Sequence, residues 1–115
     1  MAGKFEIFVD KGGEYRSRLK ASNGQIILAS QAYKSKRSAL NGVASVQRNA
    51  VAEGQFERRE SKVSFMFNLL AKNKQVIGTS ERYEGLRARE NGIKSVMKNA
   101  PDGKIEHQVE SDPKV

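Results

Sequence analysis

The feature that most constrains this chain of 115 residues is an internal repeat. Residues 21–50 align without a gap with residues 71–100, and 13 of the 30 positions are identical. The identical residues of the first copy are Ala21, Asn23, Gln25, Ile27, Ser30, Tyr33, Arg37, Asn41, Gly42, Ser45, Val46, Asn49 and Ala50. A unit of about 50 residues buries too little apolar surface to fold well by itself. We therefore expect the two copies to share one core.

The repeat also indicates where each copy begins and ends. We place the copies at residues 3–50 and 54–100 of a single domain that spans residues 1–115. Gly103-Lys104-Ile105-Glu106 matches the start of both copies, so the chain begins a third unit and stops. Residues 101–115 are therefore expected to give a C-terminal strand and an acidic tail. We predict that this strand adds to the sheet of the first copy, in the place that the strand of Phe5 or Phe56 holds elsewhere.

Alternation of apolar and charged residues predicts strands in each copy. Asn23-Gly24 favours a two-residue type I′ turn with positive φ at both residues. That turn would place Leu19 opposite Leu28, and Ala21 opposite Ile26, on the core face. Lys74 replaces the glycine in the second copy, so its turn is expected to be strained or of another type. The predicted core faces are Tyr15, Ser17, Leu19, Ala21, Ile26 and Leu28, and Phe65, Phe67, Leu69, Ala71, Val76 and Gly78.

Helical spacing of apolar residues predicts one helix in each copy. Gly42 and Gly92 fall inside these helices, where glycine costs about 1 kcal/mol relative to alanine, and we interpret them as points of close packing. The expected class is α+β, with two tandem β-β-β-α repeats. Helices are expected near residues 36–49 and 86–99, and strands near 4–9, 14–21, 25–30, 55–60, 63–71, 75–80 and 103–107.

Composition favours a cytoplasmic protein with no membrane span. The longest aliphatic run, 26–29, is far too short to cross a bilayer, and no secretory signal is evident at the N-terminus. The chain has no cysteine, so it has neither a disulfide framework nor a thiolate metal site. We expect a monomer, because the tandem repeat mimics a dimer.

The residue types that carry catalysis are sparse, so we expect no enzyme activity, no metal and no cofactor. His107 is the only histidine, and no glycine-rich phosphate loop is present. Ser30, Tyr33 and Arg37 recur as Ser80, Tyr83 and Arg87. We interpret these two sets as fixing the junction between strand and helix. The alternative is a paired polar groove between the copies that meets a symmetric or extended ligand.

The net charge of +8 favours an anionic partner. Residues 1–50 carry nine Lys/Arg against three Asp/Glu, so the first copy is the more basic one. Arg16, Arg18 and Lys20 alternate onto the face opposite the core, about 7 Å apart, close to the spacing of backbone phosphates. The basic residues at the start of the first helix are Lys34, Lys36 and Arg37. We predict weak nucleic-acid binding without sequence specificity; the alternative is a solvated strand face.

A second hypothesis is a module for protein interaction or self-association. At the equivalent outward positions the second copy has Met66, Asn68 and Leu70, with Ile77 beside them. An apolar patch made by Met66, Leu70 and Ile77 would mark an interface with a protein partner. The acidic tail or a helix could equally cover it.

Two motifs in each copy carry a family resemblance. They are Ser-x-x-Tyr and Asn-Gly-[Val/Ile]-x-Ser-Val-x-[Lys/Arg]-Asn-Ala, each present once per copy. With the strands that precede them, they make nearly all of residues 3–107 resemble the YegP-like family of bacterial proteins. The resemblance implies a repeated unit of three strands and a helix, with terminal strands exchanged across a pseudo-twofold. It implies no particular activity.

Overall fold

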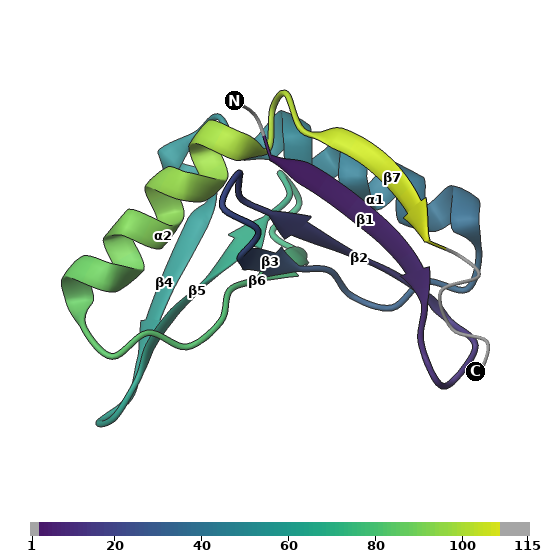
Figure 1. The fold of residues 1–115 in the computed structure, drawn as a ribbon. Helices are drawn as coiled ribbons and strands as arrows, with labels where there is room; N and C mark the ends of the chain where they lie inside the picture. Colours follow the sequence, from purple (N-terminus) through teal and green to yellow (C-terminus); the bar gives the residue numbers. More distant parts are fainter. Residues whose placement is uncertain (1–2, 109–115) are drawn as a thin grey trace.

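The computed structural model describes residues 3–108, which form one seven-stranded sheet and two long helices (Figure 1). The predicted α+β class and the two tandem β-β-β-α copies are therefore confirmed. Each predicted element is present with its ends within two residues of the expected positions. The elements of the first copy are β1 (Lys4–Val9), β2 (Tyr15–Lys20), β3 (Ile26–Ala29) and α1 (Lys36–Asn49). Those that follow are the short 3-10 helix η1 (Glu53–Gln55), β4 (Phe56–Glu60), β5 (Phe65–Leu70), β6 (Val76–Thr79), α2 (Leu86–Asn99) and β7 (Lys104–Gln108).

The sheet has the strand order β4-β5-β6-β3-β2-β1-β7. The copies join at its centre, where β3 and β6 are antiparallel and Ala29 lies opposite Thr79. Strand β7 adds to the first copy as expected, but it lies outside β1 and parallel to it, with Lys4 opposite Lys104. The expectation that it takes the place of β1 or β4 was wrong. Both places are already held by hairpin pairing, β1 with β2 and β4 with β5, so β7 occupies the open edge of β1.

The turn between β2 and β3 differs from the predicted two-residue type, whereas the turn between β5 and β6 is strained at Lys74, as expected. The amide of Ala21 donates to the carbonyl of Gln25, and the amide of Gly24 donates to Ala21, so the loop has three residues. Gly24 has φ +88°, and Lys74, its equivalent, has φ +73°. A loop of three residues with one left-handed residue makes a bulge, which shifts the pairing so that Lys20 lies opposite Ile26.

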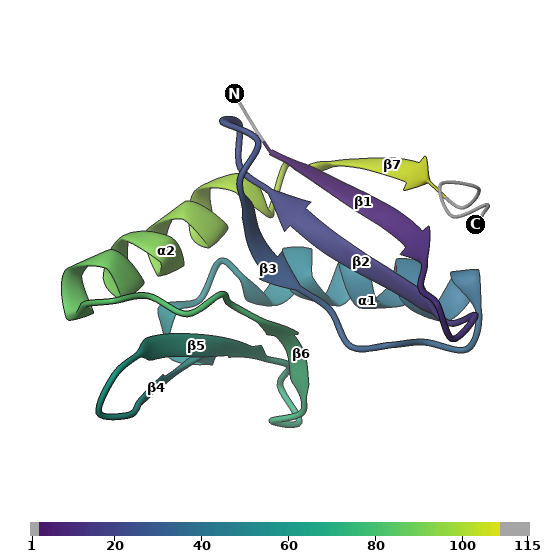
Figure 2. The same ribbon diagram turned by 60° about the horizontal axis from the view of Figure 1, so that its bottom comes forward.

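The helices pack between the two halves of the bent sheet, as Figure 2 shows. Helix α1 contacts β1 and β2 of its own copy and also β5 and β6, while α2 contacts β5 and also β2 and β3. Each helix therefore covers strands of both copies. One hydrophobic cluster results, which includes Phe5, Ile7, Leu19, Leu28, Val43, Val46, Phe67, Leu69, Ile93 and Val96. Because of the bulge, Ile26 is 43% exposed and Ile27 is buried, so the prediction that Ile26 lies in the core was wrong.

Close packing at the two helical glycines is confirmed. A Cβ on Gly42 would lie 2.5 Å from the hydroxyl oxygen of Tyr33, and one on Gly92 would lie 2.4 Å from that of Tyr83. Each tyrosine is held in place by a backbone bridge, since Tyr33 pairs with Tyr15 and Tyr83 pairs with Phe65. No helix within residues 3–108 has the length and apolar character to span a membrane.

Candidate anion-binding face

The three predicted cations of β2 lie on its outward face, but each has a carboxylate partner. Arg16 Nε lies 2.7 Å from Asp10, Arg18 Nε lies 2.7 Å from Glu6, and Lys20 Nζ lies 3.2 Å from the other oxygen of Glu6. The register of β1 against β2 causes this, because it sets Glu6 directly opposite Arg18. Three cations and two carboxylates leave this strand face with one net positive charge.

Glu6 is the centre of this charge cluster. Its side chain is only 4% exposed, covered by the cations around it. Burial alone would raise the pKa of Glu6, but the hydrogen bonds and charges of Arg18 and Lys20 outweigh it and hold the pKa below its ordinary value. Glu6 is therefore ionised at neutral pH. The guanidinium of Arg18 also lies 4.6 Å from the centre of the Phe8 ring, which fixes it against the sheet.

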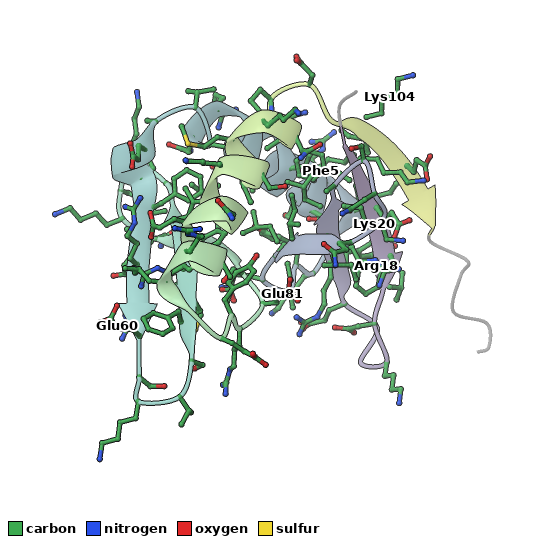
Figure 3. The ribbon with its side chains drawn as sticks, turned by 60° about the vertical axis from the view of Figure 1, so that its left-hand side comes forward. Phe5, Arg18, Lys20, Glu60, Glu81 and Lys104 are labelled. Carbon is green, nitrogen blue, oxygen red and sulfur yellow. The ribbon has the colours of Figure 1, made fainter. Side chains whose placement is uncertain are left out.

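Two further cations belong to this face that sequence reasoning missed. Lys4 lies between Lys20 on β2 and Lys104 on β7, so the three lysines form a row across neighbouring strands. Lys4 is paired with Glu106 at 3.5 Å, and Lys104 has no ion pair among residues 3–108. Figure 3 shows Lys104 projecting from the edge strand on the side of Arg18 and Lys20. The repeated Gly-Lys start was a signal for β7, but it did not reveal a parallel register.

The basic residues at the start of α1 lie near the end of β2 that begins at Tyr15, while α1 itself packs on the core side of the sheet. The bridge of Tyr33 to Tyr15 brings the chain before α1 alongside the beginning of β2. Lys34 and Arg37 are exposed and Lys36 is half-buried. None of the three has a carboxylate within ion-pair distance among the described residues. We use the name basic face for the row of lysines, the cations of β2 and the cluster at the start of α1 taken together. It consists of Lys4, Arg16, Arg18, Lys20, Lys34, Lys36, Arg37 and Lys104.

Most of the cations of residues 3–108 have no carboxylate partner within that range. Residues 3–108 contain 20 Lys/Arg and 11 Asp/Glu, and seven of each take part in ion pairs. This leaves 13 cations against four carboxylates within that range. The same residues contain no group of three or more histidines and carboxylates placed to hold a metal ion.

The outward face of the second copy is more polar and more buried than predicted. Asn68 is buried, and its side chain is satisfied there because it donates to Glu57 and accepts from the Thr79 hydroxyl, both at 3.0 Å. Ile77 is 9% exposed and belongs to the core, so its assignment to an exposed patch was wrong. Its strand β6 packs against α1 of the other copy, which the sequence of one copy cannot reveal. Met66 and Leu70 are half-buried, and their role in a protein interface stays a prediction.

The repeated serines and tyrosines fix the junction between strand and helix, as interpreted. The hydroxyl of Ser30 accepts from the amide of Ser17 at 2.8 Å and donates to the carbonyl of Gln31 at 2.7 Å. Ser80 makes the same two bonds with Phe67 and Glu81. Burial raises the pKa of both Tyr33 and Tyr83, and the charge of Glu81 adds to the effect at Tyr83. Arg37 and Arg87 are exposed at the surface, and within residues 3–108 neither forms a hydrogen bond with these serines or tyrosines, so the junction does not depend on them.

The comparisons with known proteins identify the family. The model of a domain of unknown function, DUF1508, matches residues 10–57 and again residues 61–106. The chain belongs to this family. Its two matches correspond to the two copies. Relatives that carry the name YegP confirm the YegP-like resemblance.

The relatives share sequence and fold. A UPF0339 protein from the 5′ region of the ptx operon of Stutzerimonas stutzeri is 57% identical over 70 residues, 60% of this chain and 63% of that protein. This match spans less than two thirds of that relative's length. The solution structure of YegP from E. coli is 40% identical with a TM-score of 0.89, over 95% of both chains. That of a UPF0339 protein from Shewanella oneidensis is 39% identical with a TM-score of 0.90, over 97% of this chain and 96% of the other.

Proposed function

We propose that this chain is a non-enzymatic binding module that holds an acidic polymer, nucleic acid in the simplest case, against its basic face. The observation that carries the proposal is the lateral row of Lys20, Lys4 and Lys104 across three neighbouring strands. Neighbouring strands lie about 4.8 Å apart, and alternate residues along β2 lie about 7 Å apart. Flexible lysines on such a grid can follow the phosphates of a strand that crosses it.

The ion pairs of the basic face weaken the attraction without abolishing it. Arg18 uses only Nε toward Glu6, and its other guanidinium nitrogens have no hydrogen-bond partner among residues 3–108. Arginine has five N–H donors, so it can hold Glu6 and a phosphate together. Lys34, Arg37 and Lys104 have no ion pair with a carboxylate of residues 3–108. We therefore expect these three to bind the polymer without first giving up an ion pair.

The type of contact determines the type of binding. Contacts to phosphates position a nucleic acid without reading its bases. The one aromatic ring on the outward positions of β1, Phe8, is already covered by Arg18. Binding is then weak, independent of sequence, and lost as salt concentration rises, by about 0.7–0.9 log units per contact for each log unit of salt.

Fluorescence anisotropy with labelled single- and double-stranded oligonucleotides over a range of salt tests the proposal. The triple variant Lys34→Gln, Arg37→Gln and Lys104→Gln removes three charges without breaking an ion pair. The matched control removes three exposed charges of the second copy, at Lys62, Arg82 and Arg87. Both variants have the same net charge, so a difference between them reports the location of the site.

We expect the first variant to weaken binding by about tenfold or more at low salt and to flatten the salt dependence by up to three contacts. The control is expected to change affinity much less. Equal loss in both variants would mean that only net charge matters, and absence of binding at low salt would remove the proposal.

A further inference from the structure

A polar groove runs between α2 and the turn that joins β2 to β3. It consists of two adjoining cavities of about 260 and 280 Å³, which share Ala21, Asn23, Asn91 and Ser95. Together they reach the range of roughly 300–1,000 Å³ that is typical of sites for small molecules. The walls come from different copies, because the turn belongs to the first and α2 belongs to the second. We call this space the α2 groove.

One end of the α2 groove is strongly basic. Lys94 and Lys98 lie on α2 four residues apart, so they share one face of the helix. No carboxylate lines this cavity, and neither lysine has an ion pair among residues 3–108. Like charges at this spacing repel and destabilise a helix. A bound anion would relieve that repulsion. The other end is lined by Glu81 and by Tyr83.

Most of the positions that are identical in sequence between the two copies lie in the walls of the groove. Nine of the 13 positions that are identical between the copies line it, four from the first copy and five from the second. They are Ala21, Asn23, Gln25, Ile27, Tyr83, Asn91, Gly92, Ser95 and Asn99. Packing accounts for several of them. Gly92 leaves room for Tyr83, Asn23 accepts the amide of Gln25 at 3.0 Å, and Asn99 donates to the carbonyl of Ser95 at 2.8 Å.

Packing does not account for Asn91. It is exposed in the middle of α2, and its side chain has no hydrogen-bond partner among residues 3–108. The same holds for Asn41 at the equivalent place in α1. Asparagine is a poor helix former, so a helix that needed only stability would have alanine or lysine there. A donor and acceptor that is unused inside the protein, at the wall of a cavity, is suited to hydrogen bonding with a ligand.

We propose that the α2 groove binds a small organic phosphate, with the phosphate between Lys94 and Lys98 and the polar body of the ligand along Asn91 and Asn23. Ammonium groups and amides without an opposing carboxylate are the donors that a phosphate ester needs. The equivalent cavity of about 420 Å³ between α1 and the turn from β5 to β6 keeps a cation on its helix, Arg48, and adds Lys72 from the turn. This inference does not depend on the basic face.

The probes are AMP, ribose 5-phosphate, adenosine and inorganic phosphate, each titrated into ¹⁵N-labelled protein by NMR. We expect saturable shifts at the amides of residues 21–25 and 91–98 with AMP or ribose 5-phosphate, and none with adenosine. Tighter binding of AMP would show that the base is read, and equal affinity would show that the sugar phosphate suffices. Lys94→Gln with Lys98→Gln is expected to weaken binding by about tenfold or more.

Two controls make the result decisive. Lys62→Gln with Lys74→Gln removes the same charge from exposed positions on two turns and is expected to leave the affinity unchanged. Asn91→Ala, which favours the helix, is expected to weaken AMP binding while the melting temperature stays the same or rises. The proposal is overturned if no phosphate probe shifts these amides at millimolar concentration, if adenosine binds as well as AMP, or if the lysine variants bind equally.

Discussion

The junction of the two copies depends on one pair of equivalent positions, Leu28 and Gly78. Leu28 lies opposite Leu19, and Gly78 lies opposite Leu69, at matching places in the two copies. A Cβ on Gly78 would lie 2.6, 2.8 and 3.1 Å from three side-chain carbons of Leu28. Two leucines therefore cannot occupy these positions together. The first copy has leucine at this position and the second has glycine, because leucine in both copies would make the two side chains clash.

This contact predicts the effect of Gly78→Ala. Replacing glycine inside a strand gains about 0.5–1 kcal/mol, and overpacking a core costs about 1–3 kcal/mol. Because all three contacts are with a buried side chain, we expect the clash to win, by about 1–2 kcal/mol. Leu28→Ala leaves a cavity and is expected to cost about 2–5 kcal/mol. In the double variant the new methyl group enters the space that Leu28 leaves, so the losses do not add.

Urea unfolding of the four proteins, followed by far-UV circular dichroism, measures this coupling. We expect the double variant to be more stable than the sum of the single losses predicts, by about 1–3 kcal/mol. Additivity within about 0.5 kcal/mol would show that residues 28 and 78 do not touch, and would refute the proposed junction of the two copies.

Three further predictions concern the edge strand and the charged groups. Deleting residues 102–115 removes β7 and its pairing with β1, and calorimetry should show a melting temperature lower by about 5–10 °C. An unchanged melt would contradict the role of β7 in closing the sheet. Because the pKa of Glu6 is depressed in the fold, its stabilising effect is complete above the ordinary glutamate pKa and is lost as pH falls. Between about pH 6 and about pH 3, the free energy of unfolding should therefore fall less in Glu6→Gln than in the unmodified protein. An equal fall in urea melts of the two proteins would count against the stabilising role of the Glu6 charge cluster. Arg89 is only 4% exposed and forms ion pairs with Glu60 and Glu90, so Arg89→Ala should lower the free energy of unfolding by about 2–3 kcal/mol. Arg59→Ala, at an exposed ion pair, should lower it by less than about 1 kcal/mol. Similar losses for the two variants in urea melts would disprove this distinction.

Much of the fold could be predicted because it depends on local periodicity. The alternation in β2 and the helical spacing before Asn49 are properties of short segments, and the repeat transfers each prediction to the other copy. The turn was predicted wrongly because Asn-Gly suits more than one hairpin loop. Only the hydrogen bonds of Ala21 show that the loop has three residues. The bulge that follows exchanged the exposures of Ile26 and Ile27.

The site was predictable only in part, because its properties depend on contacts between segments. Alternation correctly set Arg16, Arg18 and Lys20 on the outward face. Their pairing with Glu6 and Asp10 depends on the cross-strand register, which alternation does not specify. The burial of Ile77 and the walls of the α2 groove depend on helices that pack across the copies. No pattern within a single copy carries that information.

The most direct test of the central claim is to map a bound oligonucleotide on the protein itself. A short single-stranded oligonucleotide is titrated at low salt into ¹⁵N-labelled protein, and amide shifts are followed to saturation. The account predicts that the largest shifts fall on β1, β2, β7 and residues 34–37, and that they disappear as salt is added. Shifts centred on β4 and β5, or none at all, would contradict it.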